Sequence, residues 1–145
     1  QLLSNRNPWD DTVINSTDDL FLVYNPFTWI SEYKFDGSKL GLYHKINLEN
    51  TIQSMVYGHS QIIVDNIATT FKEMRNYVLA AIALRYDIEL VEPSTEWCYN
   101  VEECFKRNTH GVPLEAIQRM ADRFESTESC YAKINFMKKK IEGIQ

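Results

Sequence analysis

The fold of this chain is most constrained by the stretch QIIVDN at residues 61–66, a continuous apolar run that ends at Asp65. An unbroken apolar strand suits a sheet that is covered on both faces, because a sheet with one wet face would show alternating apolar and polar residues. Two further runs have strand character, VIN at 13–15 and YDIELVE at 86–92, and Pro93 halts the second. The sequence therefore predicts a parallel sheet that is buried between helices.

Helical patterns separate these strands. Between residues 38 and 57 apolar side chains recur near helical spacing. A second helix is predicted to begin after Thr69 or Thr70 and to continue to about residue 85, with Glu73 placed to close a capping box at its start. Alternating strands and helices are typical of an α/β fold with a parallel sheet.

The remaining segments give weaker patterns. Residues 22–37 are interpreted as an irregular excursion that packs locally. A short helix is expected around 101–106, and a longer one over 113–125 with Pro113 at its favoured first position. A helical tail is expected over 129–142. At 145 residues without an internal repeat or a low-complexity linker, the chain is predicted to be one domain over 1–145.

Charge and cysteine content exclude several classes of protein. A net charge of −5 argues against a generic nucleic-acid coat, although a local basic groove remains compatible with it. The chain has no 18-residue apolar run and no secretory leader, so neither membrane insertion nor secretion is expected. Its three cysteines form no CxxC pair, which favours unpaired thiols and no metal site. An intracellular location is expected, in the nucleus or the cytoplasm.

Acidic residues follow each predicted strand. Asp18 and Asp19 come after the first strand, Asp65 and Asn66 after the second, and Glu92 after the third. In open parallel sheets the carboxyl ends of the strands share one edge, and ligands bind there. Acids that converge on one edge suit either a magnesium–phosphate site or a general base.

Eight short motifs carry a family resemblance: STDDLF (16–21), YKF (33–35), His44 with Asn47, GHSQIIVDN (58–66), KEMRNYV (72–78), VEPSTEW (91–97), KRNTHGV (106–112) and IQRMADRFE (117–125). In this order and with these gaps, residues 14–125 resemble the polynucleotide-kinase-like P-loop domain of the Nedd-four-binding-protein-two-like family. More distantly they resemble the phage polynucleotide kinases. The resemblance implies a three-layer P-loop-kinase-like fold, a parallel sheet with helices on both faces.

The phosphate-binding loop of that family is not in this sequence. Family members have a strand, a GxxGxGK[ST] loop and a helix before the STDD strand, and residues 1–4 align with the last turn of that helix. The first glycine of this chain is Gly37, and GK[ST] does not occur in it. A P-loop binds phosphate through successive backbone N–H groups and a lysine, and the next hydroxyl holds magnesium. We therefore expect no cofactor for this chain, and ATP with magnesium only if a P-loop precedes Gln1.

The resemblance also implies roles for single residues. Asp18 matches the acid that accepts the proton of the 5′-hydroxyl acceptor, and Arg107 matches the lid arginine that stabilises charge on the transferred phosphate. Asp65 matches an acid on the acceptor and magnesium side, a group to which we add Asp19 and Asn66.

Two departures from the family pattern weaken these assignments. The family's DNTN reads Asp65-Asn66-Ile67-Ala68 here, so a hydroxyl and an amide are lost. The phage enzymes carry an arginine three residues after the base, where this chain has Phe21.

Each candidate also has an ordinary structural interpretation. Asp18 and Asp65 could cap turns, Asp19 could begin a helix, and Arg107 could be a solvated neighbour of Lys106. His44, on a largely apolar helix face, is interpreted as a packed, hydrogen-bonded histidine.

Aromatic residues near the same edge give a further alternative. Most of the tryptophans and tyrosines are expected in the core, while Tyr33 and Trp97 are candidates for stacking on a base.

Two functions follow as alternatives. The first is a degenerate, catalytically inactive kinase-like domain that binds a protein or RNA and holds no nucleoside triphosphate. The second is a fragment of an active 5′-hydroxyl polynucleotide kinase whose P-loop lies upstream. In the family the missing strand lies between 62–65 and 88–92, so we expect the gap to be filled by a swapped segment, by a protein partner, or by direct closure of these two strands.

Overall fold

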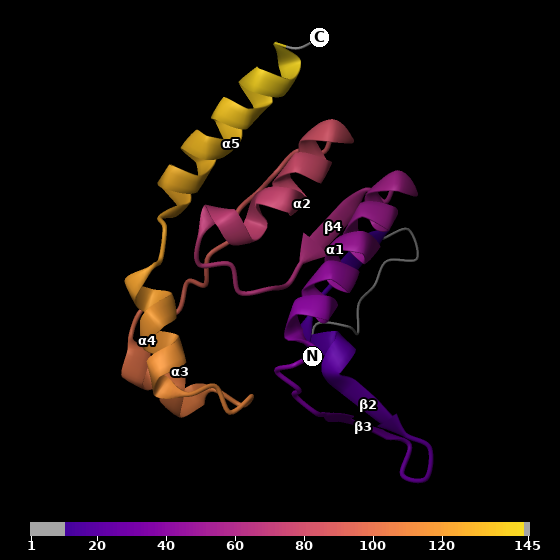
Figure 1. Ribbon diagram of the computed structural model, residues 1–145, viewed down its shortest axis with the longest axis vertical. Coiled ribbons are helices and arrows are strands. Elements are labelled where there is room, and N and C mark those ends of the chain that lie inside the picture. Colours follow the sequence, from indigo (N-terminus) through magenta and orange to yellow (C-terminus); the bar gives the residue numbers. More distant parts are fainter. Residues whose placement is uncertain (1–10, 144–145) are drawn as a thin grey trace. The chain divides into compact units, whose positions relative to one another are not determined.

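The computed structural model describes residues 11–143, which form helices and short strands in two compact units (Figure 1). The first unit ends at Asn66 and the second begins at Ile67. The mixed α/β class expected from the sequence is confirmed, with a small parallel sheet in the first unit. The three-layer arrangement and the single domain stay predictions.

The first unit is built around two parallel strands and one long helix. Strands β1 (Thr12–Asn15) and β4 (Gln61–Val64) pair in register, with Asn15 opposite Val64. Helix α1 (Leu40–Val56) connects them through the crossover and packs on both strands. These three elements match the predicted strand, helix and strand.

A hairpin replaces the irregular excursion that we expected over 22–37. After the 3₁₀ helix η1 (Asp18–Phe21), strand β2 (Leu22–Asn25) pairs antiparallel with β3 (Ile30–Tyr33). The expectation was wrong because residues 22–25 and 30–33, on the two sides of the turn, pair with each other as strands. The turn is closed by a hydrogen bond from Trp29 N–H to the Asn25 carbonyl (2.9 Å), with Trp29 at a φ of 58°.

Helices make up the second unit. They are α2 (Phe71–Ala83), α3 (Val101–Arg107), α4 (Leu114–Asp122) and α5 (Thr127–Glu142). Their buried core lies between α2 and α5 and consists of Phe71, Val78, Cys130 and Ile134. All three cysteines are free thiols, as their spacing predicted.

The sequence predicted the start of α2 correctly. Glu73 Oε2 accepts hydrogen bonds from the backbone N–H groups of Thr69 (2.7 Å) and Thr70 (3.2 Å), as a capping box requires. The start of α4 was predicted one residue early, because Pro113 is the N-cap residue with a ψ of 147°.

The third predicted strand, at 86–92, does not form among the described residues. Ile88 and Leu90 pack against the helical core, and Leu90 N–H donates to Tyr131 Oη at 2.8 Å. A strand needs a hydrogen-bonding neighbour, and within residues 11–143 strand β4 pairs with β1 alone. Direct closure of 62–65 against 88–92, which belong to different units, stays a prediction.

Crossing a membrane requires helices that are both long and apolar. Within residues 11–143, none combines the length and the apolar character that crossing a bilayer requires.

Candidate functional site

The parallel pairing of β1 and β4 sends the two following segments to one edge of the first unit. Thr17, which is 3% exposed, lies between them. Its backbone N–H donates to Asn66 Oδ1 at 2.9 Å, and its Oγ1 lies 3.2 Å from His44 Nδ1 on α1. The structure thus brings the STDD motif against Asn66, as the shared strand edge predicted.

Asp18 follows Thr17 and presents an exposed carboxylate held from one side. Tyr33 Oη donates a hydrogen bond to Asp18 Oδ1 at 3.2 Å, and the Asp18 N–H donates to Ser16 Oγ at 3.3 Å. Burial first, and the Asp18 charge second, raise the pKa of Tyr33, so the phenol keeps its proton and stays a donor. The Tyr33 ring packs against Phe21 with ring centroids 5.9 Å apart. Tyr33 therefore positions Asp18, and its stacking on a base stays a prediction.

Asp19 and Asp65 are exposed at the same end of the first unit. The backbone N–H of Asp65 donates to the Asn15 carbonyl at 2.9 Å, which continues the β1–β4 pairing by one step. Within residues 11–143, no three His, Cys, Asp or Glu side chains are arranged to hold a metal ion. The acids therefore do not form a magnesium site by themselves.

Binding of the phosphates of ATP would depend on where the glycines of the chain lie. A phosphate cradle is formed by successive backbone N–H groups, usually at glycines that let the chain approach closely. Gly58 has a φ of 80°, but it follows the carboxyl end of α1, where carbonyl groups point outward. Gly111 has a φ of 67°, and a Cβ added at Gly41, Gly58 or Gly111 would meet nothing within 4 Å. That these residues hold no nucleotide stays a prediction.

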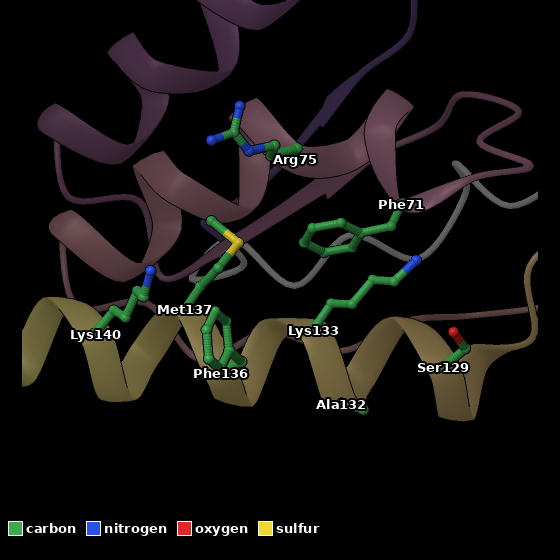
Figure 2. A pocket seen from close by; sticks show the side chains of 8 residues that line it. All are labelled: Phe71, Arg75, Ser129, Ala132, Lys133, Phe136, Met137 and Lys140. Atoms are coloured by element: carbon green, nitrogen blue, oxygen red, sulfur yellow. The ribbon is translucent and has the colours of Figure 1, made fainter.

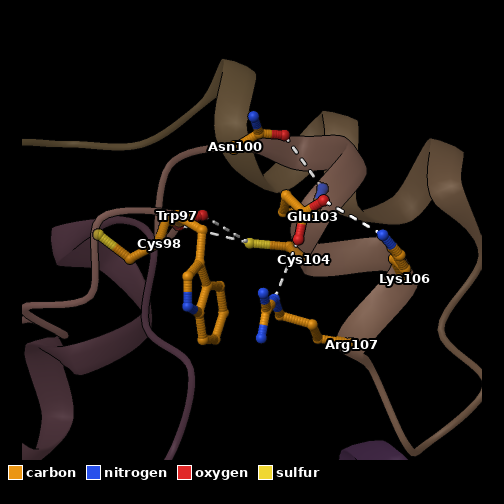
Figure 3. Close-up of polar contacts among 7 residues, drawn as sticks. All are labelled: Trp97, Cys98, Asn100, Glu103, Cys104, Lys106 and Arg107. Carbon is orange, nitrogen blue, oxygen red and sulfur yellow. Dashed lines mark hydrogen bonds and ion pairs between the residues drawn. The ribbon is translucent and has the colours of Figure 1, made fainter.

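Arg107, at the end of α3 in the second unit, is held by two neighbours (Figure 3). Its Nε donates to Glu103 Oε2 at 3.0 Å, and its Cζ lies 4.8 Å from the centroid of the Trp97 ring. Lys106 also pairs with Glu103, with Nζ and Oε1 3.6 Å apart. The Arg107 guanidinium therefore covers one face of the Trp97 ring, a face that could otherwise stack on a base.

A shallow pocket of about 290 Å³ lies beside this pair and includes Trp97, Arg107 and His110 in its lining. The loop that borders it is fixed by Asn108, whose Oδ1 accepts from the N–H groups of His110 and Val112, each at 3.0 Å. Fixed backbone beside an exposed guanidinium suits contact with an anionic group.

The two groups of candidates belong to different units. Asp18, Asp19, Tyr33, Asp65 and Asn66 lie in the first unit, and their mutual contacts run through Thr17 and Tyr33. Trp97 and Arg107 lie in the second unit.

Several contributors were not found by sequence reasoning. His44 was interpreted as a packed, hydrogen-bonded histidine; its hydrogen bond is confirmed by the contact with Thr17, but it is exposed, so the expectation of packing was wrong. Glu103 and Asn108 were not singled out. The i,i+4 spacing of Glu103 and Arg107 on a predicted helix was the signal that could have indicated their pairing.

The pairing of Glu103 predicts a dependence of stability on pH. The hydrogen bond from Arg107, followed by the charge of Lys106, lowers the pKa of Glu103 below its ordinary value of 4.5. Because the folded pKa is depressed, the stabilising contribution is complete above that ordinary value and is lost as the pH falls through the folded pKa. We expect the Glu103→Gln variant to lose the part of the acid unfolding transition that arises from protonation of Glu103. Trp97 fluorescence reports the unfolding of α3. An unchanged acid transition in that variant would contradict the pairing.

The amino-acid sequence of this chain is similar to that of a known human protein. NEDD4-binding protein 2 of Homo sapiens is 34% identical over 113 residues, which are 78% of this chain and 6% of that protein. The chain thus spans about 6% of the length of the curated relative it matches. No protein-family model matches the chain, and no solved structure does. The similarity supports the family resemblance.

Proposed function

Starting from this similarity, we propose that the chain is the acceptor-binding part of a polynucleotide-kinase-like domain. In this proposal it binds the 5′-hydroxyl end of a nucleic-acid strand at Asp18. The 145 residues themselves hold no nucleoside triphosphate, so on their own they bind an end and do not phosphorylate it.

The observation that carries the proposal is the placement of the Asp18 carboxylate. It is exposed, it follows a parallel strand directly, and the Tyr33 hydroxyl orients it through a 3.2 Å hydrogen bond. A carboxylate in this setting accepts a hydrogen bond from a hydroxyl group, whereas it repels a phosphate. The geometry therefore favours strands that end in a 5′-hydroxyl over strands that end in a 5′-phosphate.

We expect the chain to bind a 3′-fluorescein-labelled oligonucleotide with a 5′-hydroxyl about tenfold more tightly than the same oligonucleotide with a 5′-phosphate, a difference of about 1.4 kcal/mol. Fluorescence anisotropy measures both affinities. Asp18→Asn should remove the discrimination because the amide does not repel the phosphate. Glu49→Gln, on the exposed face of α1, makes the same change in net charge and should leave the discrimination intact.

Equal binding of both ends by the unaltered chain would overturn this assignment. A titration with ATP and magnesium tests whether these residues bind a phosphoryl donor, and we expect no binding. Nucleotide bound by these residues alone would refute the inactive, end-binding form of the proposal and would favour the active kinase.

A second function, protein binding, is favoured by the backbone of residues 86–92. This segment pairs with no strand among the described residues, although its side chains pack as those of a sheet strand would. The Leu90 N–H donates to Tyr131 Oη, and in an extended segment the peptide groups of the neighbouring residues face the opposite side, where they offer a template for an added strand. The name of the human relative states that it binds NEDD4. We propose that a strand from a protein partner, or from a second copy in a swapped dimer, pairs with residues 86–92.

Hydrogen exchange tests the swapped dimer. If a second copy supplies the strand, the amides of Glu89 and Val91, on either side of the Leu90–Tyr131 hydrogen bond, should exchange slowly at high micromolar concentration and rapidly at low concentration. A change in sedimentation from dimer to monomer should accompany this difference. The amides of the loop at 94–96 are the internal control. A monomer with unprotected amides at all concentrations would rule out the swapped dimer and leave the protein partner.

A further inference from the structure

The positive charge of this acidic chain is concentrated on α2 and α5 of the second unit. These two helices contain only three acidic residues in their described spans, Glu73, Glu128 and Glu142, although the chain as a whole has a net charge of −5. They carry six of its 15 lysine and arginine residues, namely Lys72, Arg75, Lys133, Lys138, Lys139 and Lys140.

A shallow groove of about 540 Å³ lies between the two helices (Figure 2). Three of its lining residues are the cations Arg75, Lys133 and Lys140, and no acidic residue is among the described residues that line it. Figure 2 shows Phe136 and Met137 on α5 between the two lysines. The groove therefore has an apolar floor with cations along its length.

The aromatic rings of the groove are paired with these cations. Lys140 Nζ lies 5.1 Å from the centroid of the Phe136 ring, and Lys133 Nζ lies 5.7 Å from that of Phe71. Phe71 is buried, whereas Phe136 is 60% exposed and offers a flat apolar surface. Lys133 and Lys140 are seven residues apart, so they are separated by about 10 Å along the helix axis, with Phe136 between them.

We propose that the α2–α5 groove binds the backbone of single-stranded nucleic acid. Arg75 and Lys140 contact phosphates, whereas Lys133 is paired with Glu125, and Phe136 stacks on a base beside Lys140. Single-strand binding sites combine these two elements, a cationic groove and exposed aromatic rings. An acidic peptide would match the cations but would leave the Phe136 ring without a flat partner. The site goes beyond the proposed end recognition because it lies in the other unit and does not use Asp18.

The test uses an oligo(dT) strand blocked at its 5′ end by fluorescein, so that recognition of a 5′-hydroxyl does not contribute. Anisotropy titrations at several salt concentrations give the affinity and the slope of its logarithm against that of salt. Each phosphate contact to a single strand contributes a slope of about −0.7, so Arg75→Gln with Lys140→Gln should reduce the slope by about 1.4. Phe136→Ala should weaken binding by about fivefold or more and leave the slope unchanged.

Lys45→Gln with Arg119→Gln is the matched control, since it removes the same charge from exposed positions on α1 and α4. It should change neither affinity nor slope. A control variant that weakens binding as much as the groove variant would overturn the proposal, because binding would then follow net charge alone. The proposal also fails if a polyglutamate peptide competes as well as unlabelled oligo(dT) and Phe136→Ala has no effect.

A cooperative thermal unfolding transition shows that each variant is folded. If Phe136→Ala does not fold, Phe136→Leu replaces it, because leucine keeps much of the side-chain volume but lacks the flat ring. Asp18→Asn separates the two proposals. It should leave binding of the blocked strand unchanged even where it abolishes the preference for a 5′-hydroxyl.

Discussion

Replacing Phe21 by alanine is expected to destabilise the first unit by about 3–5 kcal/mol, the usual cost of removing a fully buried phenylalanine. Phe21 is 2% exposed and is surrounded by the rings of Tyr33, Phe35 and Tyr43, with centroids 4.7–5.9 Å apart. No other aromatic side chain of the first unit's described residues is as deeply buried. Its removal leaves a cavity that the short hairpin strands and α1 can close only in part.

Urea unfolding, monitored by hydrogen exchange of amides in the first unit, measures this loss of stability. Phe27→Ala is the control, because Phe27 is 93% exposed and its truncation should change stability by no more than about 0.5 kcal/mol. Since Phe21 ends η1, the same variant should also lose the preference for a 5′-hydroxyl end through displacement of Asp18. A Phe21→Ala protein with the stability of the control would show that the aromatic cluster is not the core of this unit.

Replacing Ile134 by alanine is expected to destabilise the second unit by about 2–5 kcal/mol. Ile134 is 1% exposed and belongs to the core between α2 and α5, together with Phe71, Val78 and Cys130. The groove that we propose for nucleic acid is formed by these same two helices. Loss of their packing should therefore weaken binding of the blocked strand as well as stability.

Asn135→Ala, at the next and exposed position of α5, is the control and should change neither property. Circular dichroism melting curves give the stability, and the anisotropy assay gives the binding. If Ile134→Ala unfolds α5 and leaves oligo(dT) binding intact, the groove between the helices is not the binding site.

The elements that could be predicted are those specified by residues close in sequence. The apolar spacing over 38–57 predicted α1, and Glu73 with the threonines before it predicted the start of α2. In each of these cases the contacts that stabilise the element span about one helical turn. Local patterns carry that information, so one sequence was sufficient.

Long-range pairing was harder to predict. The run at 86–92 has strand composition, but a strand also needs a neighbour, and none of the described residues supplies one. The hairpin of β2 and β3 was missed for the opposite reason, because Pro26 and the five aromatic residues of the segment 22–37 suggested irregular packing and masked the pairing across the turn.

The residues of the candidate site in the first unit divide in the same way, into those predicted from the local sequence and those whose contacts join distant parts of the sequence. The sequence placed Asp18 and Asn66 at one sheet edge, and the Thr17–Asn66 hydrogen bond of 2.9 Å joins the segments that hold them. The partners of these residues were not visible in the sequence, since Tyr33 is 15 residues from Asp18 and His44 is 27 residues from Thr17. Side-chain contacts over such separations depend on the path of the chain, which the hairpin and α1 determine.

The hairpin also affects how this protein can tolerate insertions and deletions. In the described part of the chain, β2 and β3 pair only with each other, so the β1–β4 register does not depend on the turn between them. Residues can be added or removed between Asn25 and Ile30 without shifting Asp18 or Asn66. Relatives of this protein are therefore expected to differ in length at this turn more than at any other point between β1 and β4, and an affinity tag or a fluorescent label placed there should leave the first unit folded.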